Sequence, residues 1–258
     1  FYSFATGNEL NMNLKILSLV IIGVCILLPD VCYAFLSKDV HLLNMQNGLA
    51  DNTVSAVYKD KEGFVWFGTR NGLSRYDGRR ITNFERSRSY PSISNLKEVF
   101  DGVLAFVDNG VFSAFDLKKE RFLSVVSSSG QGIPSRGMLQ RNDSLVWVIS
   151  GSELHLMKRC ASKEGELRLR VQEKYTGWNN QDNLLVAITY SSDKKSICLI
   201  DEKGRIILLD ATNLNSFRVI DLGRTGSLSV NSVLYDDGRI WICLLYTSDA
   251  ADDLIGVD

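Results

Sequence analysis

The chain is poor in the residues that most often build catalytic and metal centres, and it has no excess of charge of either sign. It contains two histidines, His41 and His155, which stand far apart and form no metal-ligand spacing. The 29 basic residues are balanced by 30 acidic ones, so a net charge of -1 provides no basic field for nucleic acid. It has no phosphate-binding GxxxxGK string and no motif that pairs a nucleophile with a base. We therefore expect a non-catalytic segment without metal or cofactor.

The amino-terminal residues have the pattern of targeting sequence. Residues 12–34 begin at Met12, carry Lys15, continue through an apolar run at Ile16–Leu28 and end with the small residue Ala34, as in a cleaved secretory signal. The apolar run is shorter than the ~20 residues that cross a bilayer, which leaves an uncleaved anchor as the alternative. Residues 1–11 precede the plausible initiator and are interpreted as translated flanking sequence.

The carboxyl-terminal residues depart from everything before them. The string CLLYTSDAADD, Cys243–Asp253, resembles the translation of a transposon adapter used to prepare sequencing libraries. We therefore expect natural sequence to stop at Ile242 and residues 243–258 to be adapter-derived, with a genuine loop and short helix as the alternative. Of the cysteines, Cys160 and Cys198 then remain. Export permits a disulfide between them, but Cys198 lies in an apolar run where a cysteine also serves as a small hydrophobe.

Residues 35–242 have the pattern of short strands separated by tight turns. In Asn52–Asp60 apolar and polar residues mostly alternate, and Phe64–Thr69 is an apolar stretch bounded by glycine. Turn signals then separate it from the strand patterns Leu73–Tyr76 and Arg79–Glu85. Four such strands make one antiparallel sheet. A lone sheet with two apolar faces needs neighbours on both sides.

The four-strand unit recurs along the chain. Related apolar strands have equivalent central positions at Trp66, Ala105, Trp147, Cys198 and Trp241. Successive positions are 39, 42, 51 and 43 residues apart, which is the spacing of propeller blades. The longest interval holds a charged stretch that we expect to form a long outer hairpin or a surface insertion. The sequence thus predicts an all-β fold, a β-propeller fragment of four-stranded antiparallel blades with about four blades and the start of a fifth.

One unit carries a specific resemblance. The stretch Asn47–Glu85 resembles the two-component regulator propeller repeat. The matching residues are Gly48, Leu49, Trp66, Gly68, Thr69, Asn71, Gly72, Leu73, Tyr76, Asp77 and Gly78. Such a unit directly after a signal peptide resembles the start of the hybrid two-component sensors of glycan-degrading bacteria.

That resemblance implies a periplasmic sensor region on the outer side of the inner membrane. It also implies an oligosaccharide ligand, a homodimer in the full-length protein, a membrane helix downstream of this segment and a histidine kinase beyond it. This fragment would bind the ligand and transmit the signal without catalysing a reaction. The alternative is a free periplasmic propeller that acts as an assembly scaffold or as a lyase.

Few residues stand out as candidates for ligand binding. Trp66, Trp147 and Trp241 recur at the blade position, so we expect them to pack between sheets. Trp178 stands outside the repeat beside amide side chains and is the weak candidate for a ligand contact, with loop packing as its alternative. We expect His155 to be a strand residue that faces a neighbouring blade.

Two further stretches could contact anions. The cluster Arg79, Arg80, Arg86 and Arg88 could contact an acidic glycan, although charge also protects the edge of an outer strand. The glycine-rich stretch Ser127–Gly137 has no helical pattern after it, and we expect a surface loop rather than a phosphate site.

Overall fold

The computed structural model describes residues 42–85, 93–178, 183–222 and 229–244. The signal-like segment, His41, Arg86, Arg88 and residues 245–258 lie outside the described residues. Strand β18 includes Cys243 and Leu244, two residues beyond the expected boundary at Ile242. The origin of residues 243–258 stays a prediction.

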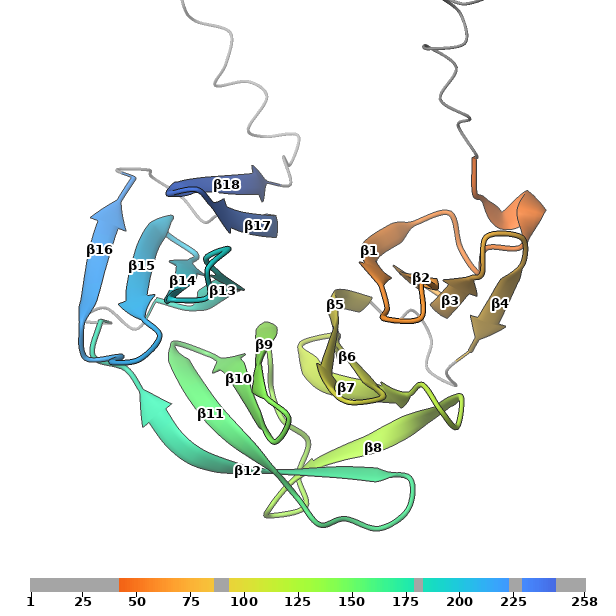
Figure 1. The fold of residues 1–258 in the computed structure, drawn as a ribbon, viewed down its shortest axis with the longest axis horizontal. Coiled ribbons are helices and arrows are strands. Elements are labelled where there is room, and N and C mark those ends of the chain that lie inside the picture. Colours follow the sequence, from red (N-terminus) through yellow and green to blue (C-terminus); the bar gives the residue numbers. More distant parts are fainter. Residues whose placement is uncertain (1–41, 86–92, 179–182, 223–228, 245–258) are drawn as a thin grey trace, which may run out of the picture. The chain divides into compact units, whose positions relative to one another are not determined.

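The described residues form four four-stranded units and one hairpin, which we call blades 1 to 5 in chain order (Figure 1). A short 3-10 helix, η1 (Met45–Asn47), precedes them. Blade 1 consists of β1 (Val54–Lys59), β2 (Val65–Thr69), β3 (Gly72–Tyr76) and β4 (Ile81–Phe84). Blade 2 consists of β5 (Ile93–Phe100), β6 (Val103–Asp108), β7 (Val111–Asp116) and β8 (Arg121–Ser127). Blade 3 consists of β9 (Gly137–Asn142), β10 (Leu145–Ser150), β11 (Glu153–Cys160) and β12 (Glu166–Tyr175).

Blade 4 consists of β13 (Leu185–Tyr190), β14 (Ser196–Asp201), β15 (Arg205–Asp210) and β16 (Phe217–Asp221), and blade 5 of β17 (Val230–Asp236) and β18 (Arg239–Leu244). Within each blade, strands consecutive in sequence pair antiparallel. The predicted all-β propeller fragment, with four blades and the beginning of a fifth, is confirmed. No helix among the described residues is long and apolar enough to cross a bilayer.

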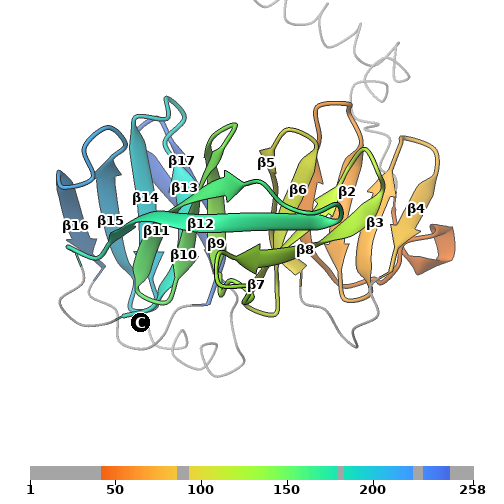
Figure 2. The ribbon, with the colours of Figure 1, turned by 90° about the horizontal axis from the view of Figure 1, so that it is seen from below.

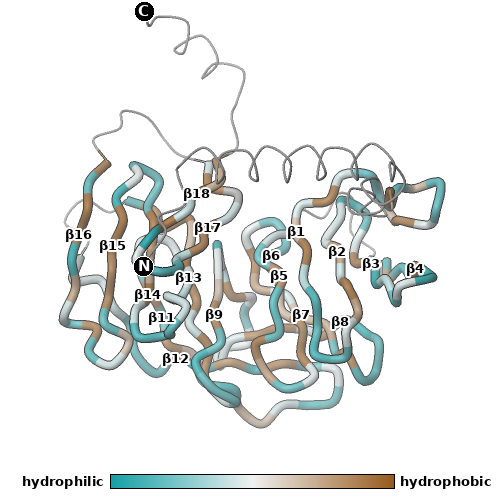
Figure 3. The backbone as a smooth tube through the Cα atoms, turned by 45° about the horizontal axis from the view of Figure 1, so that its top comes forward, coloured by the Kyte–Doolittle hydropathy of each residue, from teal (hydrophilic) through white to brown (hydrophobic). Residues whose placement is uncertain are grey.

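Turns that recur between strands are closed by an aspartate or asparagine side chain. At each one a side-chain oxygen accepts hydrogen bonds from backbone N–H groups two and three or four residues further on, as in an Asx turn. The residues are Asp60, Asp77, Asp116, Asn142, Asp201 and Asp210. Figure 3 shows the resulting pattern, with hydrophobic segments along the strands and hydrophilic residues at many turns.

Successive blades pack through one hydrophobic cluster each. Trp66 belongs to the cluster between blades 1 and 2, Ala105 to the one between blades 2 and 3, Trp147 to the one between blades 3 and 4, and Cys198 to the one between blades 4 and 5. Each repeat position in the second strand of a blade therefore faces the next blade. Trp241 occupies the same strand of blade 5 and is 61% exposed.

A glycine of the repeat allows blades 1 and 2 to approach closely. A Cβ atom on Gly68 would lie 2.5 Å from Cγ2 of Ile93, the first residue of β5. Contacts this short do not occur between real side chains, so a larger residue here would push β5 away. The glycine of the Trp-x-Gly motif is thus required by packing.

Blades 2 and 3 are joined by hydrogen bonds as well as by side chains. The first residues of β12 pair parallel with β8, from Glu166 opposite Ser124 to Leu169 opposite Ser127 (Figure 2). The rest of β12 pairs antiparallel with β11. The charged stretch after Trp147 therefore forms a long outer hairpin, one of the two arrangements expected from the sequence.

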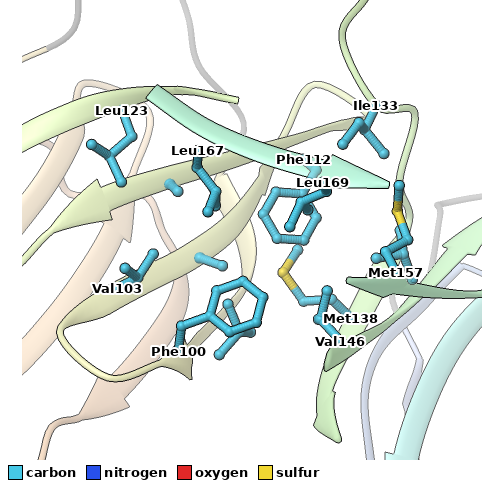
Figure 4. Packing of buried hydrophobic residues seen from close by; sticks show 14 of the residues in the cluster. Phe100, Val103, Phe112, Leu123, Ile133, Met138, Val146, Met157, Leu167 and Leu169 are labelled. Carbon is cyan, nitrogen blue, oxygen red and sulfur yellow. The ribbon is translucent and has the colours of Figure 1, made fainter. Parts of the chain in front are cut away.

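The same hairpin closes the cluster between blades 2 and 3. Leu167 and Leu169 of β12 are buried in this cluster together with Phe112 of β7 (Figure 4). Glu164, in the β11–β12 turn, bonds Lys119 at 2.8 Å and Arg121 at 2.9 Å. These contacts hold the tip of the hairpin against blade 2.

Candidate functional site

A cleft of about 500 Å³ lies between blades 1 and 2, and we call it the peripheral cleft. It is formed by the β1–β2, β5–β6 and β7–β8 turns together with side chains of β2, β3 and β5. Its charged residues are Asp60, Lys61, Glu62, Arg75, Glu98, Asp101, Lys118 and Glu120. Its aromatic residues are Phe64 and Trp66.

Arg75 covers the aromatic floor of the peripheral cleft. Its guanidinium carbon lies 4.9 Å from the centre of the Phe64 ring and 5.6 Å from that of Trp66, within the range of cation–π attraction. One guanidinium nitrogen lies 2.6 Å from a carboxylate oxygen of Glu120. The aromatic faces are therefore occupied by a residue of the chain itself and are not open to a stacked sugar ring.

Asp60 organises the turn beneath this cleft. It is 8% exposed, and its Oδ2 accepts a hydrogen bond of 2.8 Å from the indole nitrogen of Trp66. Its Oδ1 accepts from the backbone nitrogens of Glu62 and Phe64. One carboxylate thus fixes both the turn and the indole that faces blade 2.

The remaining cations of the peripheral cleft are paired. Lys61 lies 3.1 Å from Glu98, which raises the pKa of the lysine, and Glu98 also accepts a bond from the backbone nitrogen of Gly102. Lys118 lies 3.3 Å from Asp101. Each of the three cations of the cleft thus has a carboxylate partner, and the acidic residues outnumber them. Among the described residues, no group of three His, Cys, Asp or Glu side chains could hold a metal ion.

Two further cavities are lined by the first strands of the blades, and we call them the inner cavities. One, of about 370 Å³, is lined by residues of β1, β5 and β17 that include Ser55, Asn95, Lys97 and Ser232. The other, of about 500 Å³, is lined by residues that include Ser94, Asn109, Ser135 and Arg136. The described residues that line these two cavities include no aspartate and no glutamate.

The tryptophans proposed from the sequence lie in different surroundings. The indole nitrogen of Trp147 donates a 3.0 Å hydrogen bond to the hydroxyl of Tyr190, which links blades 3 and 4. Trp178 is 5% exposed, packs in the cluster between these blades and meets Phe217 edge to face at 6.3 Å. Stacking on a ligand would require Trp178 to leave this core. Its surroundings are those of the packing role that the sequence offered as the alternative.

The other residues of the first repeat unit shape turns. The hydroxyl of Thr69 donates to the carbonyl of Gly72, which has a φ of 113°. The hydroxyl of Tyr76 donates to the carbonyl of Gly78, and Asp77 binds the following backbone amides, which lowers its pKa. Asn71 donates to the carbonyl of Ala50, at a donor–acceptor distance of 3.4 Å.

The basic and glycine-rich stretches also have structural surroundings. Arg79 and Arg80 lie exposed in the β3–β4 turn, where their backbone amides bind Asp77. In the loop before β9, Ile133 is buried and its carbonyl accepts a 2.8 Å hydrogen bond from the backbone of Phe112. This loop is anchored to blade 2 and is not a phosphate cradle at the start of a helix.

His155 and the cysteines take part in no metal cluster among the described residues. His155 is 8% exposed and lies 2.5 Å from a carboxylate oxygen of Glu153. Cys160 and Cys198 are free in this structure, and burial raises the pKa of the Cys198 thiol to about 12.

Several residues of the cavities were not singled out from the sequence, notably Arg75, Glu98, Lys97 and Arg136. Arg75 follows Ser74 and Glu98 follows Lys97, and nothing in these local sequences distinguishes the two residues from solvent-facing charges. Lys97 stands just after Asn95, whose φ of 52° accompanies a bulge in β5. A bulge re-aims the side chains that follow it, and sequence alternation does not reveal it.

The blade arrangement defines the class of protein as a β-propeller. Residues 48–71 match the model of a family described as two component regulator propeller. This match lies within Asn47–Glu85, the stretch in which the sequence indicated such a repeat. A search of curated proteins found no match.

Solved structures share the fold at low sequence identity. The extracellular domain of a putative one component system from B. thetaiotaomicron superposes with a TM-score of 0.59 at 16% identity, covering 80% of this chain and 30% of that one. The extracellular domain of a putative hybrid two component system from the same organism gives 0.55 at 17% identity, covering 81% and 30%. PorZ, a surface component of the type-IX secretion system of Porphyromonas gingivalis, gives 0.57 at 13% identity, covering 80% and 27%. The chain thus spans less than a third of the length of these proteins.

Proposed function

We propose that this chain is part of the exported ligand-sensing region of a hybrid two-component sensor. The observation that carries the proposal is the match of residues 48–71 to the two component regulator propeller. Similar folds occur in the extracellular domain of a putative hybrid two component system and in that of a putative one component system. The chain supplies binding and scaffolding, and phosphoryl transfer belongs to a histidine kinase elsewhere in the full-length protein.

The proposed ligand is an oligosaccharide, recognised on the periplasmic side of the inner membrane. Binding would change the geometry of a homodimer, and a helix downstream of this segment would carry the change across the membrane. The cavities beside the first strands and between blades 1 and 2 offer hydroxyl, amide and charged groups for such a ligand. Such groups match the hydrogen-bonding needs of sugar hydroxyls.

The gene itself provides the direct test. Sequencing across the codons after Ile242 is expected to reveal further propeller blades, a membrane helix and a histidine kinase domain. A stop codon soon after the last blade would refute the sensor proposal. A glycan screen with the complete exported region tests the ligand class separately, and failure to bind any oligosaccharide would count against it.

A second candidate is an exported propeller that serves as an assembly scaffold. The observation that favours it is the similarity to PorZ, which is described as a component of a secretion system. A reading frame that ends without a kinase, together with co-purification of other exported proteins, would support this candidate instead.

A further inference from the structure

Among the described residues that line them, each of the two inner cavities has one cation and no carboxylate. Lys97 lines the cavity between β1, β5 and β17, and Arg136 lines the cavity near the start of β9. The other polar residues around them are serines and asparagines. Both cavities are lined by residues of β5, Ser94 in one and Lys97 in the other.

Lys97 is half-buried and has no ion-pair or hydrogen-bond partner for its ammonium group among the described residues. Burial alone lowers the pKa of this lysine. A buried charge without a partner is costly, and proteins seldom retain one unless something else compensates it. Arg136, in contrast, is exposed, and its side chain also has no carboxylate partner in the described part of the chain.

The peripheral cleft provides the contrast within the same molecule. There Lys61, Arg75 and Lys118 each lie within 3.3 Å of a carboxylate oxygen. What distinguishes Lys97 is that its side chain is largely withdrawn from solvent and lines a cavity, yet has no carboxylate partner among the described residues. A ligand that completes these sites would bring the missing negative charge.

We propose that the inner cavities bind a sugar acid, with a carboxylate of the ligand at Lys97 and its hydroxyl groups among Ser55, Asn95 and Ser232. A second acidic group of a longer oligosaccharide would reach Arg136. The class follows from the donors present, because an ammonium and a guanidinium bind carboxylates while hydroxyls and amides bind sugar hydroxyls. This proposal rests on the proposed function and narrows its ligand from oligosaccharides to anionic ones.

The test is calorimetric titration of the full chain with a panel of uronate oligosaccharides, each beside its neutral methyl ester, and with neutral hexose oligosaccharides. A uronate is expected to bind, and its methyl ester to bind about tenfold to a hundredfold more weakly, as for the loss of one charge-assisted hydrogen bond. The variant Lys97→Met should show the same loss, and Lys97→Arg should retain most of the affinity.

Lys174→Met is the matched control, because Lys174 lies 3.4 Å from a carboxylate oxygen of Glu153 and is not a lining residue of the three cavities. It should leave uronate affinity unchanged, and circular dichroism checks that every variant is folded. Neutral oligosaccharides that bind as well as uronates, or uronate binding that does not change in Lys97→Met, would overturn this inference and leave glycan sensing intact. Absence of binding by every sugar would overturn both proposals.

Discussion

The substitution Asp60→Ala tests whether the turn beneath the peripheral cleft is a main source of stability. The carboxylate of Asp60 is buried and accepts hydrogen bonds from the indole of Trp66 and from the backbone amides of Glu62 and Phe64. Alanine leaves the indole N–H without a partner against blade 2, where Trp66 is 1% exposed. Leaving a buried donor unsatisfied costs about 1–3 kcal/mol.

The two turn amides add a smaller contribution because water can reach them. At about 0.5 kcal/mol each, the total loss in the free energy of unfolding is about 2–4 kcal/mol. For a domain of this size each kcal/mol shifts the melting temperature by about 2–4 °C, so a decrease of about 4–16 °C is expected. Thermal unfolding followed by circular dichroism and by tryptophan fluorescence measures it.

Asp77→Ala is the matched control. Asp77 binds two backbone amides in the same kind of turn, but it is exposed and binds no indole. Its removal should cost about 1 kcal/mol or less. A double-mutant cycle that combines Asp60→Ala with Trp66→Phe should show coupling, since the second change removes the stranded N–H. Equal destabilisation by Asp60→Ala and Asp77→Ala would refute the reasoning.

Three further predictions concern charge and exposed surface. Burial lowers the pKa of Lys97 in the folded chain. Between that lowered pKa and about 10.5 the unfolded chain binds more protons than the folded chain, so the free energy of unfolding rises with pH. Lys97→Met should remove this rise in alkaline melts, and a parallel wild-type and variant profile would contradict it. The hydrogen bond from His155 lowers the pKa of Glu153, so the carboxylate stabilises the folded chain above about pH 4.5 and this stabilisation is lost as the pH falls through the lowered pKa. Glu153→Gln should make the free energy of unfolding depend less on pH in this acidic range. Leu234 and Trp241 are 57% and 61% exposed, so the chain should self-associate. Trp241→Ser should reduce that association in light scattering, and a monomeric wild type with a cooperative melt would exclude it.

The blades could be predicted from the sequence because their signals are local. Asn-Gly and Asp-Gly pairs fix where the chain turns, and the strands between them are short apolar runs. The recurrent position is informative even where its residue changes, since Ala105 and Cys198 lie in the second strand and face the next blade just as Trp66 does. Spacing carries this information, and side-chain identity adds little to it.

The sites could not be predicted in the same way. Whether Trp178 lies in a core or on a surface depends on contacts with β16, about forty residues away in the chain. Lys97 looks like any charge in a strand, and its lack of a partner becomes evident only when five blades are placed together. The parallel pairing of Glu166 with Ser124 joins strands whose local patterns contain no information about each other.

The parallel pairing of β8 with β12 affects the order in which the blades unfold. In repeat proteins the stability of each unit is set largely by its contact with its neighbours. Blades 2 and 3 form one eight-stranded hydrogen-bonded sheet through a four-residue ladder between β8 and β12. The backbone of blade 4 meets its neighbours only at single contacts among the described residues, from Leu185 to Gly151 and between Ser191 and Tyr235. The two middle blades therefore constitute one cooperative unit, and their amide hydrogens should exchange last, after those of blades 1, 4 and 5. Such a unit would act as a rigid centre against which the outer blades move.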